Sequence, residues 1–147
     1  MKFRLIISPD DEESVTVVAR QRSSLTDKLE AMVLAHTGED TIAVFTEDEM
    51  RRLTYDEIQC FTVLEGKTYA IDSKGVRYRV KQRLYELESR LPACFFRINK
   101  STLANEAALE CFTSTYSGGV CAKFRCGYED YVSRRCFTAI KRRFLNK

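Results

Sequence analysis

The chain has 147 residues, 44% of them hydrophobic and 31% charged, which suits one domain or one small domain with an appendage. No apolar run approaches the roughly 20 residues of a membrane helix. The short apolar stretch at the start meets acidic residues too soon for a signal peptide. We therefore expect a cytoplasmic protein without membrane insertion. The single histidine, His36, makes most zinc enzymes and histidine-based catalytic pairs poor candidates.

The charge is unevenly distributed along the chain. The net charge is only +3, but residues 1–50 hold five Lys/Arg against eleven Asp/Glu, a balance of −6. Residues 51–147 hold 19 Lys/Arg against ten Asp/Glu, a balance of +9. This asymmetry is typical of a polyanion-binding part beside a part with another role. A solvated surface with uneven charge is the alternative that charge alone leaves open.

Six cysteines occur without a CxxC pair, and only one close pair is present, whereas four-cysteine zinc sites usually have two. We expect reduced, mostly buried thiols, because cysteine is among the residues most often buried. Metal binding and redox regulation are the alternatives. The cysteines are Cys60, Cys94, Cys111, Cys121, Cys126 and Cys136.

Residues 1–46, which we call the leader, carry four expected elements. Met1–Ser8 alternates in a strand-like pattern, and Val15–Ala19 is a second strand candidate. Apolar residues at helical spacing predict a helix over Leu25–His36, and Thr41–Phe45 follows as another strand. The leader is therefore expected to form a small N-terminal β-β-α-β segment.

Residues 47–147 form the second expected domain, which is dominated by short strands separated by turns. A helix that ends at Pro92 and a final helix capped by Ser133 are the helical parts. These patterns predict an α+β fold that is predominantly antiparallel β. The expected strands are Ile58–Leu64, Thr68–Ile71, Val76–Val80, Phe95–Ile98, Thr102–Ala104, Leu109–Thr113, Val120–Arg125 and Tyr128–Val132.

The sequence carries no P-loop, GxGxxG or HExxH motif, so we expect no enzyme, no catalytic residue, no metal and no cofactor. Positive side chains instead concentrate at turns and at the ends of elements. Turns are exposed and mobile enough to enter a groove of a nucleic acid. Two arginines directly after Ser133 would add charge to a helix N-terminus, which already favours phosphate.

Several motifs stand in a fixed order along the basic part: Phe95-Phe96-Arg97-Ile98-Asn99-Lys100-Ser101, then Asn105, then Gly127 and Ser133-Arg134-Arg135. In that order they resemble the LytTR DNA-binding domain family, and the resemblance covers roughly residues 47–147. It implies stacked antiparallel sheets with few helices. It also implies a bacterial transcription regulator whose loops enter successive major grooves of promoter DNA.

The resemblance also implies a set of DNA-binding residues. Arg134 is the best candidate to read a base, because a guanidinium can pair with two atoms of a guanine edge. Lys67 and Lys100 lack a planar fork and are expected to grip phosphate. Arg97 and Arg135 are expected as either phosphate contacts or members of ion pairs. The full set is Lys67, Arg97, Lys100, Ser101, Arg134 and Arg135.

We therefore expect sequence-specific binding of double-stranded DNA at promoter sites. Many family members carry a receiver domain in front, and 46 residues are too few for one, which indicates a stand-alone regulator. The leader is expected to serve homodimerisation or a regulatory partner. A protein-interaction module with a basic face, or a module for single-stranded nucleic acid with stacking aromatics, is the alternative.

Overall fold

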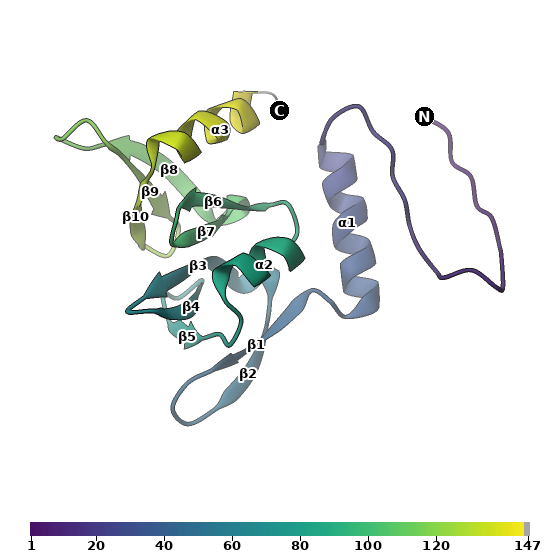
Figure 1. Ribbon diagram of the computed structural model, residues 1–147, viewed down its shortest axis with the longest axis horizontal. Helices are drawn as coiled ribbons and strands as arrows, with labels where there is room; N and C mark the ends of the chain where they lie inside the picture. The colour runs from purple at the N-terminus through teal and green to yellow at the C-terminus, as the bar shows by residue number, and fades with distance from the viewer. Residues whose placement is uncertain (146–147) are drawn as a thin grey trace.

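The computed structural model describes residues 1–145, in which ten strands form two antiparallel sheets and three α-helices accompany them (Figure 1). The first sheet has the order β2-β1-β5-β4-β3-β7-β6, and the second has the order β10-β9-β8. The helices are α1 (Ser24–Thr37), α2 (Leu84–Arg90) and α3 (Arg134–Leu145). The strands are β1 (Thr41–Phe45), β2 (Met50–Thr54), β3 (Ile58–Leu64), β4 (Lys67–Asp72), β5 (Arg77–Arg79), β6 (Phe95–Asn99), β7 (Thr102–Asn105), β8 (Leu109–Ser114), β9 (Val120–Phe124) and β10 (Glu129–Val132).

The expected α+β class with predominantly antiparallel strands is confirmed. Every strand predicted after residue 40 is present, with ends that differ by a few residues at most. The sequence did not predict β2, because only Leu53 of its five residues is buried and the usual alternation is weak. No helix within residues 1–145 is long and apolar enough to cross a membrane.

The first core lies on one face of the larger sheet, where α2 covers it. Phe61 of β3 and Leu103 of β7 are almost fully buried and belong to the same cluster as Leu84 and Leu87 of α2. The four-residue and three-residue spacings of the leucines give α2 a single apolar face, and Pro92 follows its end. This core fixes α2 and the loop after it against the sheet.

The second core joins the two sheets to α3. Phe124 of β9 is fully buried, and it shares a cluster with Ile98 of β6 and Ile140 of α3. Phe112 of β8 meets the ring of Phe137 edge-on, with 6.0 Å between ring centroids. Because α3 covers both β8 and β6, it ties the smaller sheet to the larger one (Figure 1).

The leader differs from its prediction. Within residues 1–145 no strand precedes β1, so the strands expected at Met1–Ser8 and Val15–Ala19 are not formed. The segment before α1 runs extended at the side of the molecule, away from both cores (Figure 1). An isolated pair of strands is marginal in water, because a strand needs both a hydrogen-bonding neighbour and a covered face. The helix is present as α1, with Ser23 as its N-cap and Gly38 in the left-handed conformation after it.

The strand Thr41–Phe45 is present as β1, but it lies inside the larger sheet between β2 and β5. Its residues Ile42 and Val44 are buried in the first core. The division of the chain after residue 46 stays a prediction, although the sheet itself begins at Thr41.

Two truncations test where the folded domain begins. Removal of residues 1–38 should leave the free energy of unfolding nearly unchanged, since this part buries no side chain. Removal of residues 1–46 also deletes Ile42 and Val44, and burial of each such side chain is worth about 1.5–3 kcal/mol. We therefore expect a loss of about 3–6 kcal/mol in urea denaturation for the longer cut. Equal stability of the two truncated chains would contradict a sheet that depends on β1.

Candidate nucleic-acid interface

Three basic elements meet along one edge of the molecule. The first is the turn between β3 and β4, where Glu65 and Gly66 both have positive φ, of 53° and 77°. Two such residues make a type I′ hairpin turn, in which glycine avoids steric strain. Lys67 follows the turn, pairs with Leu64 across the ladder and is exposed. The turn thus presents the Lys67 amine to solvent at the end of the sheet.

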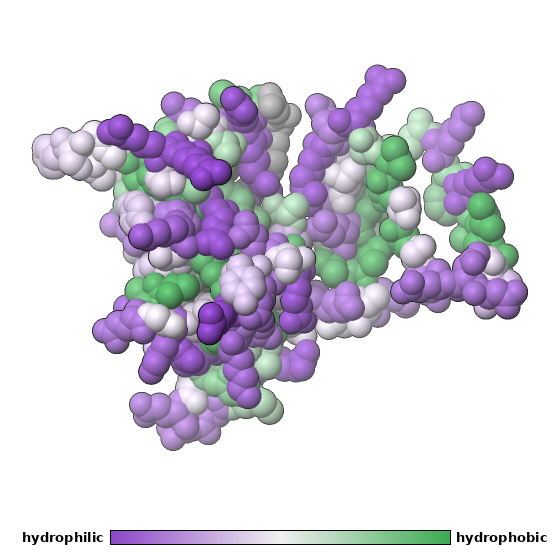
Figure 2. All heavy atoms as spheres, viewed as in Figure 1, coloured by the Kyte–Doolittle hydropathy of each residue, from purple (hydrophilic) through white to green (hydrophobic). Residues whose placement is uncertain are grey.

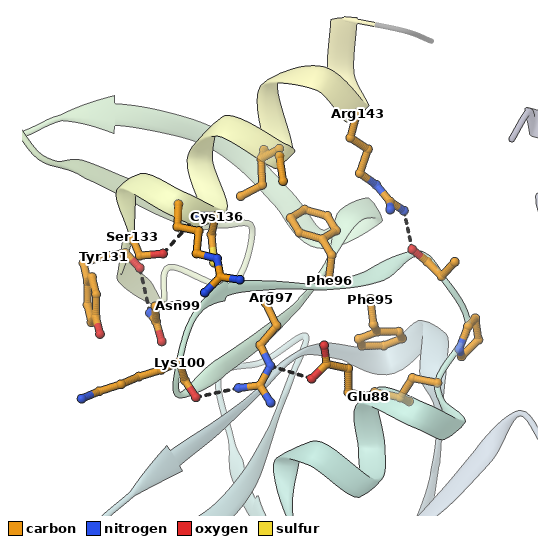
Figure 3. Close-up of a pocket in the computed structure, with 16 residues that line it drawn as sticks. Glu88, Phe95, Phe96, Arg97, Asn99, Lys100, Tyr131, Ser133, Cys136 and Arg143 are labelled. Atoms are coloured by element: carbon orange, nitrogen blue, oxygen red, sulfur yellow. Dashed lines mark hydrogen bonds and ion pairs between the residues drawn. The ribbon is translucent and has the colours of Figure 1, made fainter. Parts of the chain in front are cut away.

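The second element is the turn between β6 and β7, which contains Lys100 and Ser101. The backbone N–H of Val63 donates to the carbonyl of Ser101 at 2.9 Å, so this turn lies beside the end of β3. The side chain of Asn99 accepts from the Ser101 N–H at 2.8 Å and holds the turn closed. Lys100 is exposed at its tip, and Figure 3 shows its side chain extending away from the neighbouring residues.

The third element is the start of α3. The hydroxyl of Ser133 accepts from the Cys136 N–H at 3.2 Å, which confirms Ser133 as the helix cap. Arg134 and Arg135 follow directly and are both exposed. The Ser133 N–H donates to the carbonyl of Ile98 at 2.9 Å, so the helix begins next to β6. A helix start carries free N–H groups, and here two guanidinium groups reinforce its positive end.

The hydrogen bonds of Asn99 link the second element to the third. Its amide donates to the carbonyl of Tyr131 at 2.8 Å, two residues before the Ser133 cap (Figure 3). Asn99 is only 1% exposed, so water cannot satisfy its amide. Its nitrogen bonds to Tyr131 and its oxygen bonds to Ser101, both within the protein. Sequence reasoning missed this role, although Asn99 stands between the predicted strand Phe95–Ile98 and the basic turn.

A relay of side chains, buried at Thr62 and Thr102 and partly buried at Asp130, also crosses from the larger sheet to the smaller one. The Thr102 hydroxyl donates to the carboxylate of Asp130 at 2.6 Å. Because a hydroxyl has one proton, Thr62 is the donor in its 2.9 Å bond to Thr102. Bonds inside a low-dielectric interior are costly to leave unmade, so this relay fixes β10 against β3 and β7.

A hollow of about 1130 Å³ opens between α2, β6 and α3 (Figure 3). Its lining brings together Lys100, Arg97 and Arg135, three of the six predicted site residues. Arg143 also lines the hollow, and Glu88 is the acidic residue of the lining. Tyr131, which sequence reasoning did not single out, stands on its rim and is half exposed. The hollow therefore has an apolar floor with Lys100 and Arg135 as its two unpaired positive side chains, next to the edge formed by the three basic elements.

Arg97 is engaged within the protein. Its Nε atom lies 2.8 Å from the carboxylate of Glu88 on α2, and its Nη1 atom donates to the carbonyl of Lys100 at 2.6 Å. Of the two roles expected for Arg97, the structure contains the ion pair. Within residues 1–145, Lys67, Lys100, Arg134 and Arg135 form no ion pair, so their charges face solvent.

The cysteines offer little chemistry at this surface. All six thiols are free, and only Cys60 is fully buried, so the expectation of mostly buried thiols holds for one residue alone. Burial raises the pKa of Cys60 well above its usual range, and burial also raises the pKa of Cys94 and Cys121. A raised pKa keeps these thiols protonated and poorly nucleophilic. In the described part of the chain, no three His, Cys, Asp or Glu residues come together to hold a metal ion.

Two antiparallel sheets with basic turns along one edge define a β-rich class of nucleic-acid-binding domain. The family model of the LytTr DNA-binding domain matches residues 48–145. The chain therefore belongs to the LytTr DNA-binding domain family, as the sequence motifs predicted.

The chain is also similar to known relatives, and its fold is similar to that of a solved structure. Uncharacterized HTH-type transcriptional regulators of Staphylococcus aureus, in strains NCTC 8325 / PS 47 and COL, are 27% identical over 146 residues, 97% of each chain. The fold matches the LytTr DNA-binding domain of a Bacillus cereus protein described as a methyl-accepting/DNA response regulator. That match has a TM-score of 0.64 at 17% identity and covers 70% of this chain and 94% of the other. Strands separate all three α-helices of residues 1–145, so this part of the chain contains no helix-turn-helix.

The role of Asn99 can be tested by Asn99→Ala. The change leaves the Ser101 N–H and the Tyr131 carbonyl without their partner, which costs about 1–3 kcal/mol of unfolding free energy. We expect that loss in urea denaturation, together with weaker binding to every duplex, because the turn and α3 lose their alignment. The neighbouring change Lys100→Ala is the control and should shift stability by less than about 0.5 kcal/mol. Similar stability losses for the two variants would argue against an anchoring role for Asn99.

Proposed function

We propose that this protein binds promoter DNA sequence-specifically and regulates transcription in a bacterium. The observation that carries the proposal is that the Lys67 turn, the Lys100 turn and the start of α3 share one edge. Residues far apart in sequence thereby form a row of three basic projections. A row of separate projections suits successive grooves of a duplex better than it suits one small ligand.

Each projection has a chemical role in this proposal. Arg134 enters a major groove and pairs with two acceptors of a guanine edge. Lys67 and Lys100 grip phosphates as compact charges, with Ser101 beside Lys100 as a hydroxyl partner. Arg135 contacts phosphate from the first turn of α3, and Arg97 acts by holding the Lys100 turn in place.

The setting of this function is also part of the proposal. A promoter-binding protein works in the cytoplasm, and paired promoter sites suit a homodimer or a complex with a regulatory partner. The acidic leader supplies a surface for such association, since its charge opposes contact with DNA.

Binding of single-stranded nucleic acid is less favoured than binding of a duplex. The most exposed tyrosines, which would stack on unpaired bases, lie on separate elements rather than on one surface. They are Tyr85, Tyr116 and Tyr131.

Duplex binding should depend steeply on salt. Several lysines and arginines that neutralise phosphates release counterions, and affinity then falls by orders of magnitude between low and moderate salt. Fluorescence anisotropy with a labelled duplex, selected by retention of genomic fragments, gives the slope of affinity against salt concentration. A flat dependence, or no duplex retained at low salt, would refute DNA binding by this edge.

Arg134→Ala tests base reading. Loss of a bidentate contact should cost about 1–3 kcal/mol of binding free energy on the selected site and should relax preference at one base position. Lys74→Ala is the matched control, because Lys74 is equally exposed but lies in the β4–β5 turn, at the opposite end of β4 from Lys67. If Arg134→Ala weakens selected and random duplexes equally, Arg134 contacts phosphate and not a base.

A further inference from the structure

The leader holds the largest share of exposed apolar side chains in the molecule. Ten of the seventeen large apolar residues exposed within residues 1–145 belong to residues 1–32, and Figure 2 shows hydrophobic atoms gathered on that side. Phe3 is 91% exposed and Val18 is 94% exposed. Helix α1 buries no residue at all. Apolar patches of this extent usually mark an interaction surface.

Two segments of the leader have the alternating sequence pattern of strands but no neighbouring strand. Phe3, Leu5 and Ile7 alternate along the first segment, and Val15 and Val17 alternate along the second. Val15, Val17 and Leu29 of α1 line the same shallow groove, so the second segment lies along the helix. The backbone of both segments forms no ladder in the described chain. Unpaired strand edges are templates for pairing with another chain.

The distribution of charge in the leader indicates that the partner chain is a second copy of this protein. Lys2 and Arg4 lie near the start of the first segment, and four acidic residues, 10–13, lie just beyond its end. Antiparallel pairing of two Met1–Ser8 segments about a two-fold axis brings the basic end of each copy beside the acidic turn of the other. Parallel pairing would set like charges together. A surface that complements itself under two-fold rotation is what a symmetric homodimer requires.

The first two segments do not pair with each other within one chain. The Asp11 N–H donates to the Ser8 carbonyl at 3.4 Å and closes a turn between them, but among residues 1–145 no ladder forms beyond that turn. The size of the surface also fits a second copy, because a stable interface uses about 20–30 residues from each partner. The leader up to the end of α1 provides 37 residues. The similarity to the Staphylococcus aureus regulators covers 97% of each chain, so it extends through the leader.

We propose that the leader is a homodimerisation surface, in which Met1–Ser8 of two copies pair antiparallel and the resulting sheet covers the apolar face of α1. The inference rests on the proposed function only in that a dimer serves paired promoter sites. In Figure 1 the leader lies on the opposite side of the molecule from the basic edge. Pairing there leaves the two basic edges of the dimer free for DNA.

A charge-swap experiment on the full chain tests the proposal. The acidic variant carries Lys2→Glu and Arg4→Glu, and the basic variant carries Asp11→Lys and Glu13→Lys. Each variant alone should have a dimer dissociation constant raised about tenfold or more. The acidic variant sets like charges across the axis, and the basic variant leaves residues 10–13 with no net charge to attract Lys2 and Arg4. An equal mixture should recover dimers, as heterodimers of the two variants. Sedimentation equilibrium without DNA measures all three samples against the full chain, whose dimer has twice the 17.0 kDa mass of one copy.

Two controls complete the test. Glu47→Lys with Asp48→Lys alters equally exposed acids in the β1–β2 turn and should leave dimerisation unchanged. The chain without residues 1–38 should be a monomer. A monomeric full chain at every concentration, a mixture no more dimeric than its components, or a dimeric truncated chain would each overturn the proposal. A monomer that binds duplex DNA with a steep salt dependence refutes this inference alone, whereas a dimer that binds no duplex refutes the proposed function alone.

Discussion

The alignment of the basic edge depends on the hydrogen bonds at the end of β6. Asn99 donates to Tyr131, and the Ser133 N–H donates to Ile98, so the junction between β10 and α3 is fixed on the larger sheet. The relay from Thr62 through Thr102 to Asp130 adds a second, partly buried link. Without these bonds the second core would still hold α3 on the two sheets, but the first turn of α3 would lose its hydrogen-bonded alignment with the Lys100 turn.

Sequence patterns predicted most strands of the DNA-binding domain but not the assembly of its edge. Alternation and turn residues locate elements, whereas the neighbours of each element follow from tertiary packing. Lys67, Lys100 and Arg134 are separated by more than 30 residues each, and only the pairing of β3 with β7 and the contact of β10 with β6 bring them together. The sequence likewise left two roles for Arg97, because its ion-pair partner Glu88 lies on α2 and comes close to Arg97 only when α2 packs on the sheet.

The leader shows that alternation of apolar and polar residues does not by itself predict a strand. The segments Met1–Ser8 and Val15–Ala19 carry a strand pattern, but that pattern records which side of a strand is to be covered and not what covers it. The converse case is β2, whose residues Arg51 and Arg52 obscure the pattern although β1 pairs with all five of its residues. In both cases the availability of a neighbouring strand, and not the propensity of the segment, decides the structure.

The surfaces that we propose for dimerisation and for DNA binding are energetically separable in this architecture. Within residues 1–145, one side-chain hydrogen bond links α1 to the sheets and helices that follow it, from the Ala93 N–H to Glu30 at 3.2 Å. Such a bond contributes about 0.5–1.5 kcal/mol, far less than either buried core. The carbonyl of Ala93 accepts from Arg143 near the end of α3, whereas Arg134 and Arg135 lie at the start of that helix. A rearrangement of the leader therefore costs little and does not need to disturb the residues that we propose to contact DNA.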